Sequence, residues 1–447
     1  MVRFWMVGLV ATGWWLTASP TLAEKDYFPV LNGPYFGQQE PGLQAQPFAP
    51  GLVSLRGRYE FALSFSPAGH ELLFTQQVPE QSVSVYHSRL EGDAWTEPAP
   101  IQLSAGARRE EMEAFFAPDG ERIFFAPYDE GMDVRIWSLE VGPDGWRNPR
   151  ELGSTVADDP AFYPTMSNRG SLYYTNLAAR KIYRAKVDGL LVSSVEDAGL
   201  EFGGHAFIAP DESFVLVDAR ESDSLGGSDI YVAFRRPDGS WARPRHLGAE
   251  VNSGFDETCP SLSADGRYLF FSRYNEPDDV SDIYWIDSAV IDAARKETTA
   301  VEAFRLLTQL EGRWLGSGGR LGTEPQETVH ELTVAAGDSV VMEVMDPDGE
   351  RELNVYHLVE GDLMLTHYCG AGIQPRLKLD IGRAAPGVLP FLLVDGSGFD
   401  PDVDRHIHSA RLVVRHGGQL ESWWTAEKEG QVVMESRFLL ERASAGR

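Results

Sequence analysis

One short pattern recurs along the first two thirds of the chain, and it restricts the fold more than any other feature. Each copy is an apolar strand, a turn of the Pro-Asp-Gly kind and a second apolar strand. Pro fixes φ, Asp accepts a backbone hydrogen bond and Gly takes the left-handed position, so each turn reverses the chain tightly between two strands. The copies begin about 50 residues apart, and their turns lie at residues 65–69, 116–120, 166–170, 208–212 and 262–266.

Each copy has room for two more strands. A third strand follows every turn, as at residues 229–231 and 282–284, and three copies end in a Gly, Trp and Pro signature around Trp95, Trp146 and Trp241. Four antiparallel strands per repeat are typical of a β-propeller. The five repeats between residues 59 and 287 predict five blades, and six blades are the alternative if residues 27 to 58 and a degenerate stretch form another.

The fifth repeat lacks its Trp-Pro strand, and residues 46–51 (Gln-Pro-Phe-Ala-Pro-Gly) resemble the missing strand. We therefore expect the N-terminal segment to pair beside the fifth repeat and close the ring, because closure removes an exposed sheet edge.

The recurring Pro-Asp-Gly turns and Asp-Ile-Tyr strands together resemble the WD-like propeller repeats of the TolB type, over roughly residues 35 to 290. The resemblance implies a propeller fold. It implies no single function, because such propellers include protein-binding scaffolds, lectin-like modules and enzyme platforms.

After residue 292 the pattern changes. Residues 293–309 are predicted to form a helical connector, and residues 310–447 alternate apolar and polar positions without the propeller turn. This alternation predicts one small antiparallel barrel. The expected organisation is all-β, with a signal peptide at 1–23, a propeller with its N-terminal closing strand at 24–292, the connector, and the barrel.

The barrel opens with Gly312-Arg313-Trp314, which resembles the Gly-x-Trp start of lipocalin-like (calycin) barrels. The resemblance implies that Trp314 plugs one barrel end beneath a short helix and that Arg437, on the last strand, stacks on it. Gly316 and Gly318 extend the motif toward the nitrobindin branch, which holds haem through a His near its C-terminus. No His follows His416, so that haem ligand has no counterpart here. The barrel also resembles uncharacterised lipocalin-like domains of exported bacterial proteins.

Six of the ten His lie in the barrel segment. His406 and His408 are two apart on a predicted strand, so they share a face, and an inward orientation would let them hold a metal with His357 or His367. A three-residue turn at Glu360 would put His357 and His367 on one face, and a two-residue turn on opposite faces. The alternative is that these imidazoles hydrogen-bond in or around a polar cavity.

Arg376 suits an anionic or carbonyl-bearing ligand, and its alternative role is to hold a surface loop. The candidate ligand-binding residues are therefore Trp314, His357, His367, Arg376, His406 and His408, and the candidate metal ligands are His406 and His408.

Carboxylates precede the inner propeller strands at Glu60, Glu113, Asp159 and Glu257, and His205 takes the similar place in the fourth repeat. Rotational symmetry would gather these groups near one end of a central channel, where they would bind a cation or form an acid/base pair if burial raises one pKa. The candidate catalytic residues are Glu113, Glu257 and His205. The alternative is that they satisfy backbone N–H groups between blades, because a structural role recurs in each blade whereas catalysis needs asymmetry. Asp229 and Asp282 are predicted to stabilise blade turns.

Charge and the N-terminal segment indicate location and partners. The 67 acidic residues exceed the 39 basic ones, and the net charge of -28 argues against nucleic acid or anionic lipid as a partner. Arg3, an apolar run and a small residue at Ala23 predict a cleaved secretory signal, so we expect a periplasmic or secreted protein without a membrane span. Cys259 and Cys369 lie in different predicted domains, which favours two separate thiols over a disulfide.

The leading hypothesis is an exported binding or scaffold protein, with the propeller as recognition platform and the barrel as a pocket for a small ligand. A carbohydrate hydrolase or lyase acting at the channel is one alternative, and an envelope protein–protein interaction module is another. The residues do not decide whether the protein is an enzyme, and they do not strongly indicate a metal, haem or another cofactor.

Overall fold

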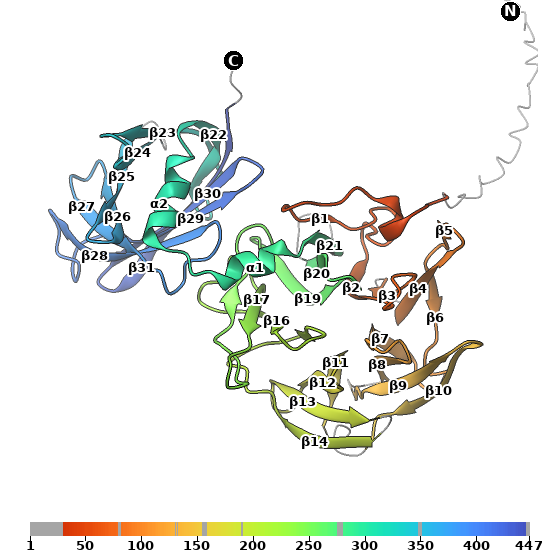
Figure 1. Ribbon diagram of the computed structural model, residues 1–447. Coiled ribbons are helices and arrows are strands. Elements are labelled where there is room, and N and C mark those ends of the chain that lie inside the picture. The colour runs from red at the N-terminus through yellow and green to blue at the C-terminus, as the bar shows by residue number, and fades with distance from the viewer. Residues whose placement is uncertain are drawn as a thin grey trace, which may run out of the picture.

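A computed structural model describes residues 30–78, 82–129, 131, 133–153, 159–188, 191–274, 280–346 and 351–443. The predicted signal peptide at 1–23 lies outside these residues. Nearly all regular structure in the described ranges is antiparallel β-sheet (Figure 1). Neither of the described α-helices has the length and apolar character needed to cross a membrane.

Each sequence repeat folds into one antiparallel group of strands. The strands are almost wholly buried where a group lies between two neighbours, and all six residues of β12 and of β17 are buried. The groups are β2 (Tyr59–Phe65), β3 (Glu71–Gln77), β4 (Val83–Glu91), β5 (Ala94–Trp95) and β6 (Ala99–Ile101); β7 (Glu110–Phe116), β8 (Arg122–Tyr128), β9 (Trp137–Gly142) and β10 (Gly145–Glu151); β11 (Ala161–Met166), β12 (Ser171–Asn176), β13 (Lys181–Asp188) and β14 (Leu191–Asp197); β15 (Ala206–Ile208), β16 (Phe214–Ala219), β17 (Asp229–Phe234) and β18 (Arg245–His246); β19 (Asp256–Leu262), β20 (Tyr268–Tyr274) and β21 (Ser281–Asp287).

The first strands of these groups form a ring. Strand β2 contacts β7, β7 contacts β11, β11 contacts β15, β15 contacts β19, and β19 returns to β2. Figure 1 shows the groups arranged around this centre in a propeller-like manner. Side chains from five distant parts of the sequence therefore meet at one place.

The N-terminal segment is tied to the last repeat. It begins with a short 3-10 helix, η1 (Pro34–Gly37), and continues into β1 (Gln46–Pro47), which pairs antiparallel with β21, so that Gln46 lies opposite Trp285. Phe48 is fully buried against the rings of Phe270 and Trp285. This pairing gives the fifth group the outer strand that its own repeat lacks.

Two helices connect the ring to a closed barrel. Helix α1 (Ala289–Arg295) precedes α2 (Ala300–Thr308), which begins with a capping box between Thr299 and Glu302. The barrel has ten strands, whereas lipocalin barrels have eight. They are β22 (Gly312–Arg320), β23 (Gln326–Ala335), β24 (Val340–Met345), β25 (Glu352–Val359), β26 (Asp362–Tyr368), β27 (Gln374–Leu379), β28 (Val388–Ser397), β29 (His406–Arg415), β30 (Gln419–Lys428) and β31 (Gln431–Arg442).

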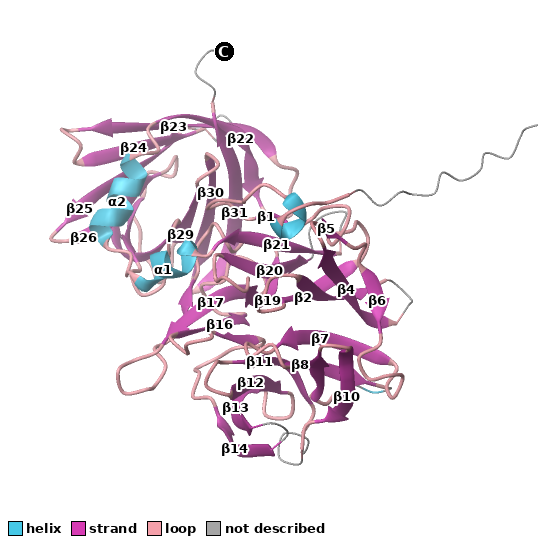
Figure 2. Ribbon diagram, turned by 45° about the vertical axis from the view of Figure 1, so that its right-hand side comes forward, coloured by secondary structure: helices cyan, strands magenta, loops and turns pink. Residues whose placement is uncertain are grey.

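The ring and the barrel share a small buried interface. Helix α1 lies between the ring and the barrel (Figure 2). The amide of Ala249 donates to the carbonyl of Pro386 at 3.0 Å. Gly248 has a φ of +89°, and an added Cβ would lie 2.4 Å from the Pro386 oxygen, so this close approach requires glycine. The apolar side chains of the interface are Leu225, Ala249, Ala385, Val388 and Val413.

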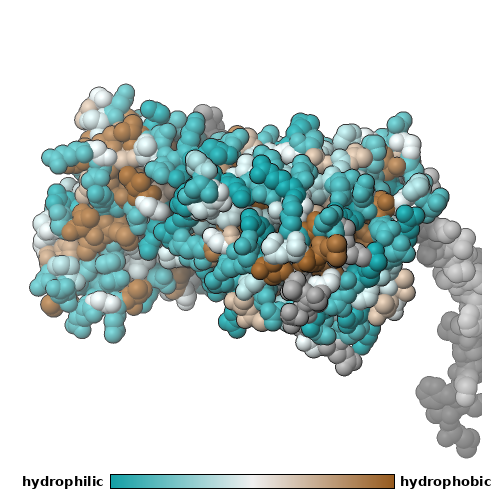
Figure 3. Space-filling view, turned by 60° about the horizontal axis from the view of Figure 1, so that its bottom comes forward, coloured by the Kyte–Doolittle hydropathy of each residue, from teal (hydrophilic) through white to brown (hydrophobic). Residues whose placement is uncertain are grey.

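The barrel also has exposed apolar side chains on its outer surface. Figure 3 shows brown patches over the barrel within a mainly teal surface. Exposed residues on its outer strands include Leu315, Leu392, Val394, Val432 and Leu439.

Candidate functional site

The inner strand of each repeat brings one equivalent residue to the centre of the ring. Counted back from the turn, these residues are Ala62, Glu113, Tyr163, His205 and Cys259. Four of them, all but His205, adopt a left-handed φ of 53 to 55° beside a register shift in the strand. Such a bulge breaks the alternation of a strand and redirects a side chain, and here it directs side chains toward their counterparts in other repeats.

Three of these five residues form a polar cluster. Ligand atoms of Glu113, His205 and Cys259 all lie within 4.8 Å of one another. His205 Nε2 is 3.7 Å from Glu113 Oε1. Glu113 Oε2 accepts a hydrogen bond from the amide of Tyr163 at 2.7 Å, which fixes the carboxylate in the channel.

Asp218, on β16, orients this cluster from behind. His205 Nδ1 lies 2.6 Å from Asp218 Oδ2, and the amides of His205 and Cys259 donate to the same carboxylate at 2.9 and 3.0 Å. When Nδ1 carries the proton that Asp218 accepts, the other ring nitrogen, Nε2, faces Glu113 and Cys259.

Burial controls the electrostatics of the cluster. It raises the pKa of Glu113 to about 7 and raises the pKa of the Cys259 thiol. Burial alone would lower the pKa of His205, but the Asp218 carboxylate outweighs it and the net pKa lies well above its usual value. The side chain of His205 is 22% exposed, so the buried cluster has one edge open to solvent.

Glu257 does not join Glu113. It lies two positions earlier in its repeat, as do Glu60 and Glu111 in theirs. Glu257 accepts from the amide of Ser253 at 3.0 Å and pairs with Arg273 at 2.7 Å. The carboxylates of this second set thus hold local structure, and Glu257 does not form an acid/base pair with Glu113.

The other members of this second set have equivalent roles. Glu111 accepts from the amides of Leu103 and Ser104 at 2.6 and 2.7 Å, and Glu60 accepts from Gln76 at 2.8 Å. Asp159 precedes that position in the third repeat, which Ala161 occupies, and it accepts from Asn176 at 3.0 Å.

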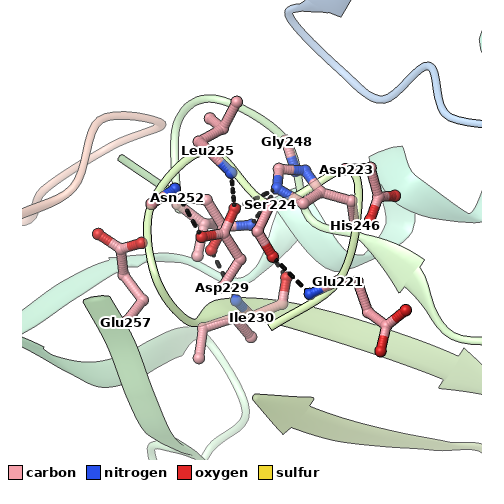
Figure 4. Close-up of polar contacts among 12 residues, drawn as sticks. Glu221, Asp223, Ser224, Leu225, Asp229, Ile230, His246, Gly248, Asn252 and Glu257 are labelled. Atoms are coloured by element: carbon pink, nitrogen blue, oxygen red, sulfur yellow. Dashed lines mark hydrogen bonds and ion pairs between the residues drawn. The ribbon is translucent and has the colours of Figure 1, made fainter. Parts of the chain in front are cut away.

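Asp229 organises a loop of the fourth repeat (Figure 4). It accepts from the amides of Leu225 and Gly226 at 2.7 and 3.2 Å. His246 Nδ1 accepts from the amide of Gly248 at 3.0 Å, so Nε2 carries the proton and donates to Asp229 at 2.6 Å. This fully used carboxylate fits the turn-stabilising role expected from the sequence.

The barrel encloses a second polar network, which spans four neighbouring strands. Glu343 accepts from His330 Nδ1 at 2.8 Å, from the Tyr356 hydroxyl at 2.7 Å and from Asn354 at 2.9 Å. Asn354 Oδ1 in turn lies 2.8 Å from His367 Nδ1. All five side chains are buried, and of these the sequence analysis had singled out His367 alone.

The protonation states in this network follow from burial and hydrogen bonding. Burial lowers the pKa of His367 to about 4, so its imidazole is neutral. Burial alone would raise the pKa of Glu343, but the hydrogen bonds from His330, Tyr356 and Asn354 outweigh it and hold the pKa below its usual value.

His357 and Arg376 lie on the outer face of the barrel. The turn after β25 has two residues, because Val359 is opposite Asp362, and His357 and His367 therefore point to opposite faces. Arg376 is half exposed and forms a bidentate pair with Asp395. Neither side chain faces the barrel interior.

His406 and His408 lie close together, with ring centroids 5.8 Å apart. His406 Nδ1 is 2.8 Å from the Asp404 carbonyl and its ring stacks on Phe399, while His408 Nδ1 is 3.3 Å from Glu427. No contact described for this part of the barrel joins the pair to His357 or His367.

Trp314 lies at one end of the barrel core, and its indole N–H donates to the carbonyl of Leu310 at 2.9 Å. The residue stacked on it is Arg442, with the guanidinium carbon 4.8 Å from the ring centroid. The prediction for Arg437 was therefore wrong: the β22–β31 register puts Arg442 opposite Trp314, and Arg437 lies over Trp423.

A pocket of about 430 Å³ lies where the ring, the helices and the barrel meet. Its apolar wall includes Leu43, Leu247, Val290, Leu306, Leu310, Trp314 and Val414. Its polar groups are Glu250, Arg415, His416 and Arg442. A larger cavity of about 570 Å³ nearby is lined mainly by polar and charged side chains, including His246 and Arg383.

The two cysteines are both free thiols, as expected from their separation. Cys259 belongs to the channel cluster, and the sequence analysis missed this role. Aligning the five turns would have found it, because Cys259 then falls at the position of Glu113 and His205.

Comparisons with known proteins return propeller folds. No protein-family model matches the chain, and no curated protein matches its sequence. A TolB-type protein from Agrobacterium tumefaciens has 18% identity and a TM-score of 0.36, covering 52% of this chain and 77% of that one. TolB from Acinetobacter baumannii has 14% identity and a TM-score of 0.33, covering 50% and 54%.

A gluconolactonase from Xanthomonas campestris is also similar in structure, with 10% identity and a TM-score of 0.35, covering 58% of this chain and 94% of that one. At these identities and TM-scores, the similarities assign neither an activity nor a partner to this chain.

Proposed function

We propose that this protein is an exported binding protein, built from a five-bladed propeller and a lipocalin-like barrel that together hold a small amphipathic ligand. The observation that carries the proposal is the pocket of about 430 Å³ at their junction. Small-ligand sites are typically several hundred Å³ in volume, largely apolar, and often located between domains.

The apolar wall suits a hydrocarbon portion of the ligand. Leu247 and Val290 come from the ring side, whereas Leu310 and Trp314 come from the barrel end. Because the barrel interior is filled by its own core side chains, the junction is a better place for a ligand than the barrel itself. In this proposal Trp314 contributes to the ligand site from the end of the barrel.

The polar side of the pocket suits an acidic headgroup. Arg415 donates to the carbonyl of Asn252 at 3.0 Å, and Arg442 donates to the carbonyls of Glu311 and Gln309 at 2.7 and 2.6 Å. These acceptors are neutral carbonyls, and the nearby carboxylates that favour the Arg415 charge, Glu421 first and then Glu250, only partly offset its burial. Glu250 Oε1 is 3.1 Å from His416 Nδ1 and accepts a hydrogen bond from the His416 amide at 2.7 Å, so this acid is already engaged within the pocket. A carboxylate on an apolar chain, such as a fatty acid, meets both requirements.

Thermal shift with palmitate and with the corresponding alcohol tests the proposal. Palmitate at about 100 times its Kd should add about 3 kcal/mol to the stability of the full chain, and the alcohol should add less because it lacks the charge. Ala293→Trp fills the pocket from α1 and should abolish the shift, and Arg415→Gln should reduce it. Arg376→Gln, on the exposed face, is the matched control. Equal stabilisation of wild type and Ala293→Trp, or none of either, would refute the proposal.

A further inference from the structure

We infer that Glu113, His205 and Cys259 bind a divalent transition metal ion, with zinc as the best match to their donor atoms, at the centre of the ring. The site is distinct from the junction pocket and does not depend on the function proposed for it. It uses the single channel position that each repeat contributes, and three of the five repeats place a metal-ligating side chain there.

The donor set selects the class of ion. One imidazole nitrogen, one thiolate and one carboxylate oxygen form a mixed set that suits Zn²⁺ and its neighbours, whereas Ca²⁺ and Mg²⁺ require oxygen ligands. Around a tetrahedral zinc with bonds of about 2.0–2.3 Å, ligand atoms stand roughly 3–4 Å apart. The 3.7 Å between His205 Nε2 and Glu113 Oε1, and the 4.8 Å limit for all three groups, are close to this spacing.

Asp218 provides the outer support that zinc-bound imidazoles usually have. A His that ligates metal through one nitrogen generally donates its other N–H to a carboxylate or carbonyl. His205 Nδ1 is 2.6 Å from Asp218 Oδ2. Asp218 also accepts the amide of Cys259, so the same carboxylate positions two of the three ligands. Both of its oxygens are used in this way, and we assign it as a positioning residue.

The remaining two channel positions supply no fourth protein ligand. Ala62 is small, and Tyr163 turns its hydroxyl away to the carbonyl of Pro260 at 2.8 Å. With three protein ligands and the edge of His205 exposed, the site resembles zinc centres that keep one position for water or a bound molecule.

A Cys-His-Asp nucleophile is the main competing interpretation of these residues. A catalytic thiol needs an electropositive setting that favours the thiolate. Here burial of Cys259, which is 3% exposed, together with the Glu113 and Asp218 carboxylates outweighs the attraction of His205 and disfavours the thiolate. A bound cation resolves the unfavourable proximity of the thiolate and Glu113, and it displaces protons from the ligands as it binds.

Cobalt(II) titration of the metal-free, reduced full-length chain tests the inference. One equivalent should produce the near-ultraviolet thiolate-to-cobalt charge-transfer band, and Zn²⁺ should displace it. Cys259→Ser should abolish the band, while Cys369→Ser is the matched control and should retain it. Asp218→Asn should weaken Co²⁺ affinity about 10- to 100-fold, and Glu113→Gln, which preserves shape if Cys259→Ser fails to fold, should weaken it at least as much.

Three results would overturn the inference. They are the absence of the band at one equivalent in wild type, its persistence in folded Glu113→Gln at unchanged affinity, and its loss in Cys369→Ser. Alkylation of Cys259 by iodoacetamide at the same rate with and without Zn²⁺ would also exclude the thiol as a ligand.

Discussion

Acidification should destabilise the barrel through His367. Its pKa is about 4 in the folded protein, against a usual value of 6.5, because burial disfavours the charged ring. Since the unfolded chain takes up the proton first, stability is lost as the pH falls from about 6.5 toward 4. Between pH 8 and pH 5 this linkage removes about 2 kcal/mol, or roughly 4–8 °C in the melting temperature of a domain of this size.

The pH range from 8 to 5 separates the contribution of His367 from that of Glu343, the buried acid of the same network. The lowered pKa of Glu343 contributes stability above its usual value of 4.5, and this contribution is lost only as the pH falls through the folded pKa. Two further groups face His367: Glu343 favours its charged form, and Glu352 lies 3.7 Å from Nε2. Both acids favour protonated His367 and so oppose the lowering of its pKa. A large pH dependence of stability would therefore mean that the burial of His367 outweighs them.

Calorimetry of the full chain at pH 8, 6.5 and 5 provides the assay. The barrel transition can be identified by its downward shift in Tyr356→Phe, which removes one hydrogen bond to Glu343. His367→Gln retains a donor for Asn354 but does not titrate, so the barrel transition should lose most of its dependence on pH. His357→Gln, on the outer face of the adjacent strand, should retain it. An unchanged pH dependence in His367→Gln would refute the reasoning.

Three other predictions concern stability. Arg442→Ala removes charged hydrogen bonds to two carbonyls and the contact with Trp314, which together contribute about 2 kcal/mol, so it should lower the barrel melting temperature by about 4–8 °C. As a control, Arg437→Ala should leave the near-ultraviolet circular dichroism of Trp314 unchanged. Burial raises the pKa of Glu60 to about 8, so ring stability should fall as the pH rises from about 4.5 to 8, and Glu60→Gln should raise the ring melting temperature more at pH 8 than at pH 5. Asp229→Ala should cost about 3 kcal/mol by leaving His246 and two amides without an acceptor, and a loss below about 1 kcal/mol in urea unfolding would contradict this role.

The sequence was most informative where the determinants of structure are local. Each repeat contains its own turn chemistry and apolar strands, so the strand groups between residues 59 and 287 could be located from short segments. The outer strand missing from the fifth repeat was traceable to residues 46–51, because the segment before the first repeat carries the same Pro-rich signature, and Gln46 and Pro47 do pair with β21.

Features that depend on the register between paired strands were harder to predict from the sequence. Whether His357 shares a face with His367 depends on one residue in a turn, and whether Arg437 or Arg442 meets Trp314 depends on pairing between strands more than 100 residues apart. The buried partners Glu343 and His330 were missed because the face of each strand that points inward depends on the register of the β23–β24 hairpin.

In the central channel, the sequence identified two of the clustered residues correctly and missed the third. Glu113 and His205 were selected by their place in the repeat, and the structure brings them together. Glu257 was selected with them although it lies two positions earlier, and Cys259 was predicted only to be a separate thiol. An interval of two residues is enough to separate a carboxylate that satisfies loop amides from a thiol that faces the channel.

Anomalous diffraction from crystals of the full-length chain grown with one equivalent of Zn²⁺ would locate the bound ion directly. We expect one strong peak at the zinc edge, within bonding distance of Glu113, His205 and Cys259, with Asp218 in contact with the imidazole. Peaks confined to surface carboxylates, with the three channel side chains unchanged, would contradict it.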